Sequence, residues 1–420
     1  MNILIIGSGG REHALAWAIR QNPKCDKLTV IPGNAGISEI ANCLELNILD
    51  NNIILNFVLE NRVDLVVIGP EEPLANGLSD LLRSNKIMVF GASQAAAQLE
   101  SSKHFTKEIC KKINAPTARA KLFICKDKAK DYVLSIGAPI VIKLDGLAAG
   151  KGVVVAMDNK TALNAVDSMF GASEGSPSKK VLVEEYLDGE EASFFLLSDG
   201  KNLLPIGTAQ DHKRAYDNDL GPNTGGMGAY SPAPVLTKKI MDTAIKKIIQ
   251  PTIDEMRKNG TPYEGVIFAG LMIKNNIPKL IEYNVRFGDP ECQALMIRLG
   301  AQILDLILAC CLKRLNETKV NWADDHSITV VMATKGYPDS YINGTEIRFI
   351  TQFKNDSFNQ LFHAGTKKVQ SQLIGNGGRV LNITTRANSL MEAHDKAYKN
   401  IKNIDWPEGF YRTDIGWRAL

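Results

Sequence analysis

The segment Pro139-Ile-Val-Ile-Lys-Leu-Asp-Gly-Leu-Ala-Ala-Gly-Lys-Gly-Val153 fixes the architecture around it. Its β-branched first half predicts a strand that ends at Lys143. The loop that follows holds Lys151 among three glycines, which are Gly146, Gly150 and Gly152. Glycines let backbone N–H groups approach a phosphate closely, and lysines neutralise its charge. The segment therefore predicts a flap between two strands that covers a nucleotide.

This flap differs from a Walker A loop. Lys151 is followed by Gly152 and a β-branched run, whereas a Walker A lysine is followed by Ser or Thr and a helix. A glycine-rich hairpin with solvated lysines has the same composition, and the segment alone leaves that alternative open.

A second informative segment is Val181-Leu-Val-Glu-Glu-Tyr-Leu-Asp-Gly-Glu-Glu191. It predicts a strand that turns outward and presents backbone donors and acceptors to an adenine edge at four residues: Glu184, Glu185, Tyr186 and Leu187. Glu190 follows closely enough to accept hydrogen bonds from ribose hydroxyls. An acidic loop between two strands is the alternative interpretation.

The third segment is Lys279-Leu-Ile-Glu-Tyr-Asn-Val-Arg-Phe-Gly-Asp-Pro-Glu291. Side chains alternate along a strand, so Glu282 and Asn284 project from one face, about 7 Å apart. Mg²⁺ prefers such hard oxygen ligands, with phosphates completing its shell. Arg286 lies on the same face and can fork onto a carboxylate or a phosphate. The polar face of an edge strand, closed by a Gly-Asp-Pro turn, would look similar.

The polar segment 209–229 is long and rich in glycine, and ordered loops of this kind inside a compact domain are usually functional. Asp211 and Lys213 offer both signs of charge, and residues 223–228 offer exposed amides. His212 is either a base or part of a charged loop that caps the domain.

The N-terminal turn Gly7-Ser8-Gly9-Gly10 separates a predicted strand from a predicted helix. It is a poor dinucleotide fingerprint, because Glu12 occupies the third glycine position and the next strand lacks a ribose-binding acid. A helix N-terminus flanked by glycines still suits a single phosphate, such as that of a sugar phosphate.

The order of the predicted elements indicates a multidomain α/β and α+β protein. Residues 1–100 alternate strands and helices, which predicts a parallel, Rossmann-like substrate-binding domain. Residues 101–324 are expected to form the nucleotide-binding unit, with a small lid at about 121–190. Residues 325–420 form a C-terminal α+β unit.

Bulk composition restricts the class of protein. Lysine plus arginine exceed aspartate plus glutamate by 49 to 46, which favours neither nucleic acid nor membrane as a partner. The seven cysteines are scattered and lack zinc-site spacing, so reduced thiols are expected. The N-terminus reads as a strand rather than a secretory signal, and we expect a cytoplasmic location.

Together these segments resemble the ATP-grasp superfamily, and specifically the phosphoribosylamine–glycine ligase family. The characteristic run of that family appears as Arg286-Phe-Gly-Asp-Pro-Glu291, and its Gly-Pro-Asn-Thr-Gly-Gly-Met-Gly-Ala-Tyr-Ser-Pro appears at residues 221–232. The resemblance extends from Gly7 to Arg418, with Phe362-His-Ala-Gly-Thr366 and Tyr411-Arg-Thr-Asp-Ile-Gly416 near the end.

The resemblance implies that ATP drives the ligation of glycine to 5-phosphoribosylamine in purine biosynthesis, through glycyl phosphate. It implies that Lys103 and Lys143 contact ATP phosphates, that residues 185–187 contact adenine, and that Glu190 contacts ribose. Lys143 and Arg286 are expected to be catalytic. Mg²⁺, with Mn²⁺ as an alternative ion, is expected on Glu282 and Asn284.

The small substrates are expected to bind the N-terminal turn and four polar residues: Asp211, Lys213, Arg286 and Asp289. The quaternary state is expected to be a monomer or a weak homodimer. Three other functions remain open from the residues: a carboxylase of the biotin-carboxylase type, a nicotinamide oxidoreductase, and a nucleotide sensor without turnover.

Overall fold

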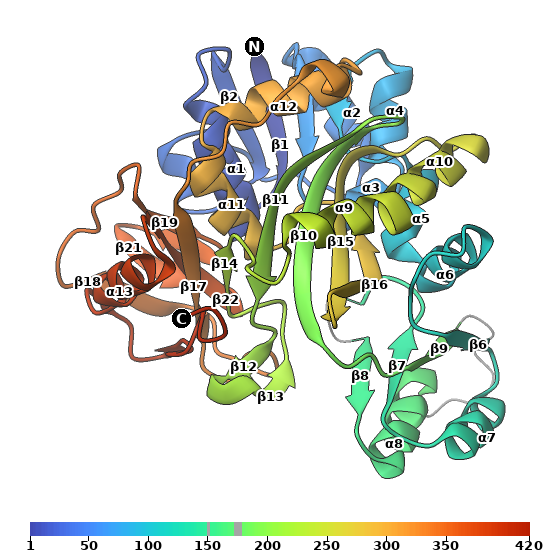
Figure 1. Cartoon of the computed structure of the whole chain (residues 1–420). Helices are drawn as coiled ribbons and strands as arrows, with labels where there is room; N and C mark the ends of the chain where they lie inside the picture. The colour runs from blue at the N-terminus through green and yellow to red at the C-terminus, as the bar shows by residue number, and fades with distance from the viewer. Residues whose placement is uncertain (149–151, 172–178) are drawn as a thin grey trace.

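The computed structural model describes residues 1–148, 152–171 and 179–420. Gly150 and Lys151 of the predicted flap lie outside these residues. The described strands form five sheets, and Figure 1 shows how they are arranged.

The N-terminal part is a five-stranded parallel sheet of order β3-β2-β1-β4-β5. Its central strand β1 (Asn2–Gly7) has four consecutive aliphatic side chains with no exposed surface. Such unbroken burial is typical of a parallel sheet covered on both faces. The other strands are β2 (Lys27–Pro32), β3 (Asn42–Cys43), β4 (Leu65–Ile68) and β5 (Met88–Phe90), and the helices are α1 (Gly10–Arg20), α2 (Asn51–Glu60), α3 (Glu71–Ala75), α4 (Leu78–Ser84) and α5 (Gln94–Ser101).

A long antiparallel sheet runs through the middle of the molecule in the order β16-β15-β10-β11-β14-β17-β22-β19. Its first strands are β10 (Glu190–Asp199), β11 (Leu203–Asp211), β14 (Gly228–Ser231), β15 (Glu264–Lys274) and β16 (Ile277–Asn284). Helix α9 (Lys238–Ala244) continues through a π-helical turn, Ile245–Ile249, into α10 (Gln250–Lys258). Helices α11 (Glu291–Leu299) and α12 (Gln302–Cys311) pack between this sheet and the N-terminal part.

A small four-stranded sheet stands apart from the rest, below α6 (Lys103–Lys112) (Figure 1). Its order is β6-β9-β7-β8, and helices α7 (Lys126–Ile136) and α8 (Asn159–Phe170) pack on it. The strands are β6 (Ala120–Phe123), β7 (Ile140–Leu144), β8 (Val153–Ala156) and β9 (Val181–Glu185). These elements enclose a hydrophobic core of their own, as a separate structural unit must.

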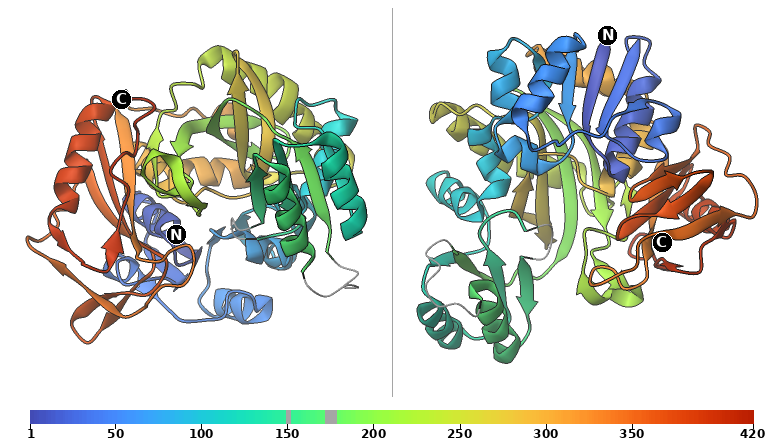
Figure 2. Two further views of the ribbon diagram at one scale, coloured as in Figure 1. Left: turned by 90° about the horizontal axis from the view of Figure 1, so that it is seen from below. Right: turned by 180° about the vertical axis from the view of Figure 1, so that it is seen from behind.

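The strands of the C-terminal part extend the central sheet, because β14 pairs with β17. This continuity was not predicted from the sequence, which indicated a last unit without showing how it attaches. The elements are β17 (His326–Thr334), β18 (Thr345–Phe349), β19 (Asn359–His363), β20 (Thr366–Val369), β21 (Gln372–Gly375), β22 (Arg379–Ala387), α13 (Leu390–Ile401), β23 (Ile404–Asp405) and β24 (Gly409–Phe410). In both views of Figure 2 the small sheet and the C-terminal part lie on opposite sides of the central strands.

This architecture confirms the predicted fold class: a parallel N-terminal sheet precedes a central α+β unit, with its small separate sheet, and a C-terminal α+β unit. No single helix in the described ranges has the length and apolar character needed to cross a membrane. Helices α11 and α12 reach that length only as a pair, and the chain bends by 104° between them.

Two buried histidines lie where the N-terminal and C-terminal parts meet. The backbone N–H of His363 donates to Nδ1 of His13 at 2.8 Å, and the two ring centroids are 5.7 Å apart. Gly36 leaves space for both rings, since a Cβ there would come within 2.5 Å of each. Burial lowers the pKa of His13 well below its usual value and that of His363 to about 4.

The interface should therefore weaken in mild acid. An unfolded histidine has a pKa near 6.5, so between roughly pH 6.5 and 4 the unfolded chain binds more protons than the folded protein, and stability falls as the pH falls. We expect His363→Asn to reduce this slope by up to about 1.4 kcal/mol per pH unit. Urea unfolding measured at intervals from pH 7 to pH 4.5 tests the prediction.

The matched control is His394→Asn, which removes a histidine from α13 outside this interface. Parallel stability curves for wild type and His363→Asn would contradict the prediction.

Candidate active site

One large cleft, with a volume of about 1080 Å³, is lined by residues from all parts of the chain. That volume is at the upper end of the roughly 300–1,000 Å³ typical of ligand sites. The N-terminal turn, the small sheet, β16 and the C-terminal loop at Tyr337 all contribute to its walls. The segments singled out from the sequence therefore face a common space, apart from the residues that the structure does not describe.

A buried carboxylate joins two lysines on one side of the cleft. Oε2 of Glu184 lies 3.1 Å from Nζ of Lys143 and 3.2 Å from Nζ of Lys107. Lys107 also donates to the hydroxyl of Thr117 and the carbonyl of Ala118. The group thus ties α6 and the linker after it to strands β7 and β9 of the small sheet. Lys107 was not predicted, because a lysine inside a helix carries no local signal of its distant partner.

The base of the flap is attached to the N-terminus of α6. Asp145 accepts a hydrogen bond from the backbone N–H of His104 at 3.1 Å and from the hydroxyl of Ser102 at 3.3 Å. Nζ of Lys103 donates to the carbonyl of Gly146 at 2.9 Å. The first predicted phosphate-binding lysine therefore lies directly beneath the described start of the flap.

An apolar slot lies beside the predicted adenine-binding segment. Val141 and Val155 line it from the small sheet, and Met272 and Ile281 line it from the central sheet. Residues 184–187 run along the same cleft. This combination of apolar walls and a backbone edge is suited to a purine ring.

Some polar groups of the predicted adenine-binding segment already have partners within the protein. The backbone N–H of Glu185 donates to the carbonyl of Arg119 at 2.9 Å, and its carboxylate pairs with the guanidinium of the same arginine. The backbone N–H of Glu185 is therefore already engaged within the protein. Glu190 accepts from the Gln210 amide at 2.8 Å and also lines the cleft.

The predicted metal ligands lie in the middle of the cleft. Glu282 and Asn284 line it from β16, where they pair with Gly270 and Phe268 of β15. Four cations act on the Glu282 carboxylate: Lys213, Lys143, Lys103 and Arg286. Although burial alone would raise the pKa of Glu282, these cations hold it below its usual value.

An ionised carboxylate and an amide oxygen fit Mg²⁺. Across residues 1–148, 152–171 and 179–420 no three His, Cys, Asp or Glu side chains cluster as a metal site. Glu282 and Asn284 would therefore supply part of a coordination shell that phosphate oxygens complete, and the surrounding cations suit those phosphates.

Arg286 is already engaged by two carboxylates. Its guanidinium donates to Glu71 at 3.1 Å and to Glu100 at 2.8 Å, while Glu100 also accepts from the backbone N–H of Val285. Burial raises the pKa of Glu100 to about 7, and the positive charge of Arg286 opposes that rise. Arg286 lines the cleft. Its guanidinium N–H groups, which were predicted to bind a carboxylate or a phosphate of the ligand, already bind Glu71 and Glu100.

Several ionisable side chains gather near the end of β11. Burial raises the pKa of Asp211 to about 8, against the charge of Lys213. Lys213 forms an ion pair with Glu191. Asp211, Lys213 and Glu191 all line the cleft.

His212 points elsewhere and has a structural role. Its side chain is fully buried, its Nε2 accepts from the backbone N–H of Gly416, and Asp219 lies 3.9 Å from its Nδ1. The hypothesis that His212 is a base in the cleft has no geometric support.

The N-terminal turn is partly filled by carboxylates. The backbone N–H of Gly9 donates to Glu12 at 2.7 Å, and that of Arg11 donates to Asp289 at 3.2 Å. A phosphate at this point would face two negative groups, so the turn is better suited to the hydroxyls of a sugar than to its phosphate.

Gly7, Ser8 and Gly9 line the cleft. Gly10 instead packs against Asn382 and Gln293, because a Cβ there would come within 2.4 Å of both amide nitrogens. The predicted substrate contact from Gly10 therefore has no support in the geometry.

Comparison with known families covers nearly the whole chain. Residues 1–100 match the N domain of phosphoribosylglycinamide synthetase, residues 101–292 its ATP-grasp (A) domain, and residues 327–418 its C domain.

Individual relatives agree with this result. A phosphoribosylamine–glycine ligase from Brucella melitensis is 52% identical over all of this chain and 98% of its own length. The crystal structure of a phosphoribosylamine–glycine ligase from Thermotoga maritima superposes with a TM-score of 0.86 at 29% identity, covering 99% of this chain and 100% of that one.

A more distant similarity concerns the fold alone. The biotin carboxylase domain of a 2-oxoglutarate carboxylase from Hydrogenobacter thermophilus superposes with a TM-score of 0.71 at 16% identity, over 98% of this chain and 91% of that one.

The buried charge group in the small sheet gives a stability prediction. We expect Glu184→Gln to lower the free energy of unfolding by about 3–5 kcal/mol, because breaking a buried ion pair leaves a buried charge uncompensated. Urea unfolding at pH 7 measures the loss.

Glu185→Gln is the control. Glu185 is next to Glu184 in the sequence, but its carboxylate pairs with an arginine side chain that is 90% exposed. That change should have little effect, because exposed ion pairs contribute little. Equal losses in the two variants would contradict the buried pairing of Glu184.

Proposed function

The chain belongs to the phosphoribosylglycinamide synthetase family, and we propose that it ligates glycine to 5-phosphoribosylamine with cleavage of ATP to ADP and phosphate. The product is glycinamide ribonucleotide, an intermediate of de novo purine biosynthesis. The observation that carries the proposal is the single cleft in which four cations converge on Glu282 beside an apolar slot.

ATP is proposed to lie between the small sheet and β16. Its adenine occupies the apolar slot next to residues 184–187, and its ribose hydroxyls face Glu190. Lys103 and Lys143 contact the phosphates, together with Gly146, Gly152 and the part of the flap that contains Gly150 and Lys151. Lys143 is suited to this role because it is buried and its ammonium reaches the cleft from β7.

Glu282 and Asn284 are proposed to hold Mg²⁺, with Mn²⁺ as an alternative ion. When bound, the ion neutralises phosphate charge at the site of phosphoryl transfer. The chain contributes an ionised carboxylate, because the surrounding cations keep Glu282 deprotonated.

The reaction proceeds in two steps. An oxygen of the glycine carboxylate attacks the γ-phosphorus of ATP, the bond to ADP breaks, and glycyl phosphate forms. The amine of 5-phosphoribosylamine then attacks the carbonyl carbon, phosphate leaves, and the amine nitrogen loses a proton. A free carboxylate is a poor acyl donor, whereas an acyl phosphate carries a good leaving group.

The protein contributes positioning and charge neutralisation to these steps. Lys143 and Arg286 are proposed as the catalytic cations. Asp211, Lys213 and Asp289 bind the small substrates together with Gly7, Ser8 and Gly9. Closure of the small sheet, residues 121–190, excludes water that would otherwise hydrolyse glycyl phosphate.

Several further predictions accompany this function. The domain boundaries at residues 100 and 324 and the movement of the lid stay predictions. So do the cytoplasmic location and the monomeric or weakly dimeric state.

Isotope transfer tests the acyl phosphate directly. With glycine labelled by oxygen-18 in its carboxylate, each released phosphate should carry one labelled oxygen, because the attacking oxygen stays with phosphorus when the carbonyl bond breaks. Mass spectrometry of the phosphate measures the label.

Omitting glycine or freshly generated 5-phosphoribosylamine should each abolish product formation. Release of unlabelled phosphate would exclude glycyl phosphate, because the carboxylate oxygen that leaves would then not have been bonded to phosphorus. ADP release that requires bicarbonate but not glycine would indicate a carboxylase instead.

The proposed metal ligand can be tested by removing its charge. Glu282→Gln is expected to lower the rate of ADP formation at least about a hundredfold, the loss typical when one electrostatic contact to the reacting groups is removed. Glu317→Gln, a surface change next to α12, controls for loss of an acidic side chain. Unchanged ADP formation in Glu282→Gln would exclude this residue from the proposed metal site.

A further inference from the structure

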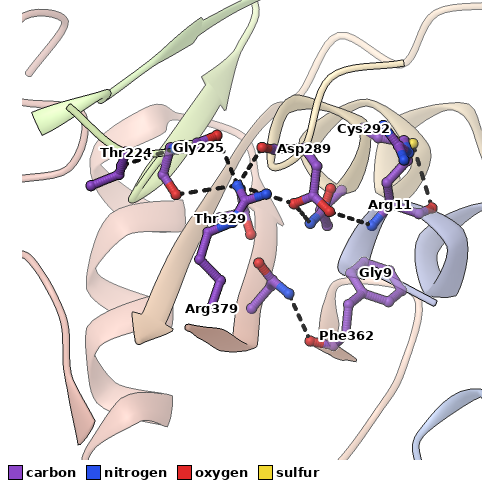
Figure 3. Close-up of polar contacts among 12 residues, drawn as sticks. Gly9, Arg11, Thr224, Gly225, Asp289, Cys292, Thr329, Phe362 and Arg379 are labelled. Atoms are coloured by element: carbon purple, nitrogen blue, oxygen red, sulfur yellow. Dashed lines mark hydrogen bonds and ion pairs between the residues drawn. The ribbon is translucent and has the colours of Figure 1, made fainter. Parts of the chain in front are cut away.

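We infer that Arg379, at the start of β22, is a positioning residue that fixes the two substrate-binding walls of the cleft relative to each other. This inference rests on the proposed function, and it adds a role for the C-terminal part of the chain. Figure 3 shows the contacts of Arg379 with Gly225 and Asp289, and that of Asp289 with Arg11.

One nitrogen of Arg379 is surrounded by oxygen atoms from two separate loops. Its Nη1 donates to the carbonyl of Gly225 at 2.8 Å, to that of Gly226 at 3.4 Å, and to the main-chain carbonyl of Asp289. Oδ1 of the Asp289 side chain is 3.4 Å away.

Tyr337 supports the same arrangement from the C-terminal part. Its hydroxyl accepts a hydrogen bond from the backbone N–H of Gly225 at 3.0 Å. Its ring packs against Gly378, where a Cβ would come within 2.2 Å of the ring. The backbone N–H of Gly225 is therefore held by Tyr337, and its carbonyl is held by Arg379.

The Gly225 loop in turn determines where Lys213 lies. The backbone N–H and the hydroxyl of Thr224 both donate to the carbonyl of Lys213, at 2.7 and 2.9 Å. The backbone N–H of Met227 donates to the carbonyl of His212 at 2.8 Å. A shift of the Gly225 loop would therefore displace the wall that carries Lys213 and its neighbour Asp211.

Asp289 connects the same arginine to a second wall. Its carboxylate accepts from the Gln293 amide at 2.9 Å and from the backbone N–H of Arg11 at 3.2 Å. The positive charges of Arg379 and Arg11 keep the pKa of Asp289 below its usual value despite burial. Arg379 thus links the wall at Lys213 with the wall at Asp289 and the N-terminal turn.

The ATP-binding residues do not depend on this link. Lys103, Lys143 and residues 184–187 are held by α6 and the small sheet, as described above. Loss of Arg379 should therefore affect the use of glycine and 5-phosphoribosylamine, and leave the interaction with ATP largely intact.

The test compares Arg379→Met, Arg379→Lys and a matched control. Arg386→Met removes an arginine from the same strand with nearly equal side-chain exposure, 20% against 21%, but its partners are Ile297 and Asp325 outside the cleft. Kinetics are measured with ATP, glycine and freshly generated 5-phosphoribosylamine, each varied in turn. Hydrogen exchange of residues 223–228 is measured by mass spectrometry.

For Arg379→Met we expect kcat/KM for glycine and for 5-phosphoribosylamine to fall at least about tenfold, because small misplacements of binding groups slow reactions strongly. The KM for ATP should stay within about twofold of wild type. Arg379→Lys should recover part of the loss, since its ammonium keeps the charge and N–H donors on a shorter stem. Exchange in residues 223–228 should accelerate in Arg379→Met and not in Arg386→Met.

Equal changes in the Arg379→Met and Arg386→Met variants, or a KM for ATP that rises as much as the other constants, would overturn the inference. Inactivity of the wild-type enzyme with glycine would instead reject the proposed function. The exchange measurement is independent of activity and would still test whether Arg379 holds the loop.

Discussion

The cleft depends on one electrostatic constraint: several cations face the same small volume around Glu282. Lys103, Lys143, Lys213 and Arg286 all act on Glu282. Mutual repulsion among such cations would open the site unless carboxylates from other elements held each one in place. Glu184 does this for Lys143, Glu191 for Lys213, and Glu71 with Glu100 for Arg286. The cations that line the cleft are suited to contact a polyphosphate.

This constraint also explains why the chain is assembled from several packed parts. The cations come from α6, the small sheet, the end of β11 and the loop after β16, so no single unit contains the site. A unit with its own core, such as the small sheet, can change its position without losing its internal packing. The walls that carry Lys213 and Asp289 are instead joined to the central sheet and the C-terminal part, which suits them to hold small substrates at a fixed distance.

The same architecture serves other chemistry. A biotin carboxylase domain shares the fold at 16% identity, so the fold leaves open which carboxylate is activated and which nucleophile accepts it. Residues 223–225 and the turn at Gly7 are two of the loops that line the cleft in this chain. Hydrogen bonds to backbone atoms hold both loops in place. Such hydrogen bonds fix the position of the main chain, and they do not depend on which side chains the loop residues carry.

Local sequence patterns determined the elements of this protein: the apolar run of β1, the alternation of Glu282 and Asn284 along β16, and the glycine-flanked strand ending at Lys143. They also predicted the fold class and most residues of the cleft, because motif segments keep their residue types together along the chain. Only the tertiary structure decided the partners. It assigned His212 to the C-terminal segment, turned Gly10 away from the cleft, placed Glu12 and Asp289 against the N-terminal turn, and brought in Lys107 and Arg379. Apart from the hydrogen bond between Gly9 and Glu12, which are three residues apart, each of these outcomes depends on contacts between residues far apart in sequence, and no periodicity or spacing within a segment encodes them.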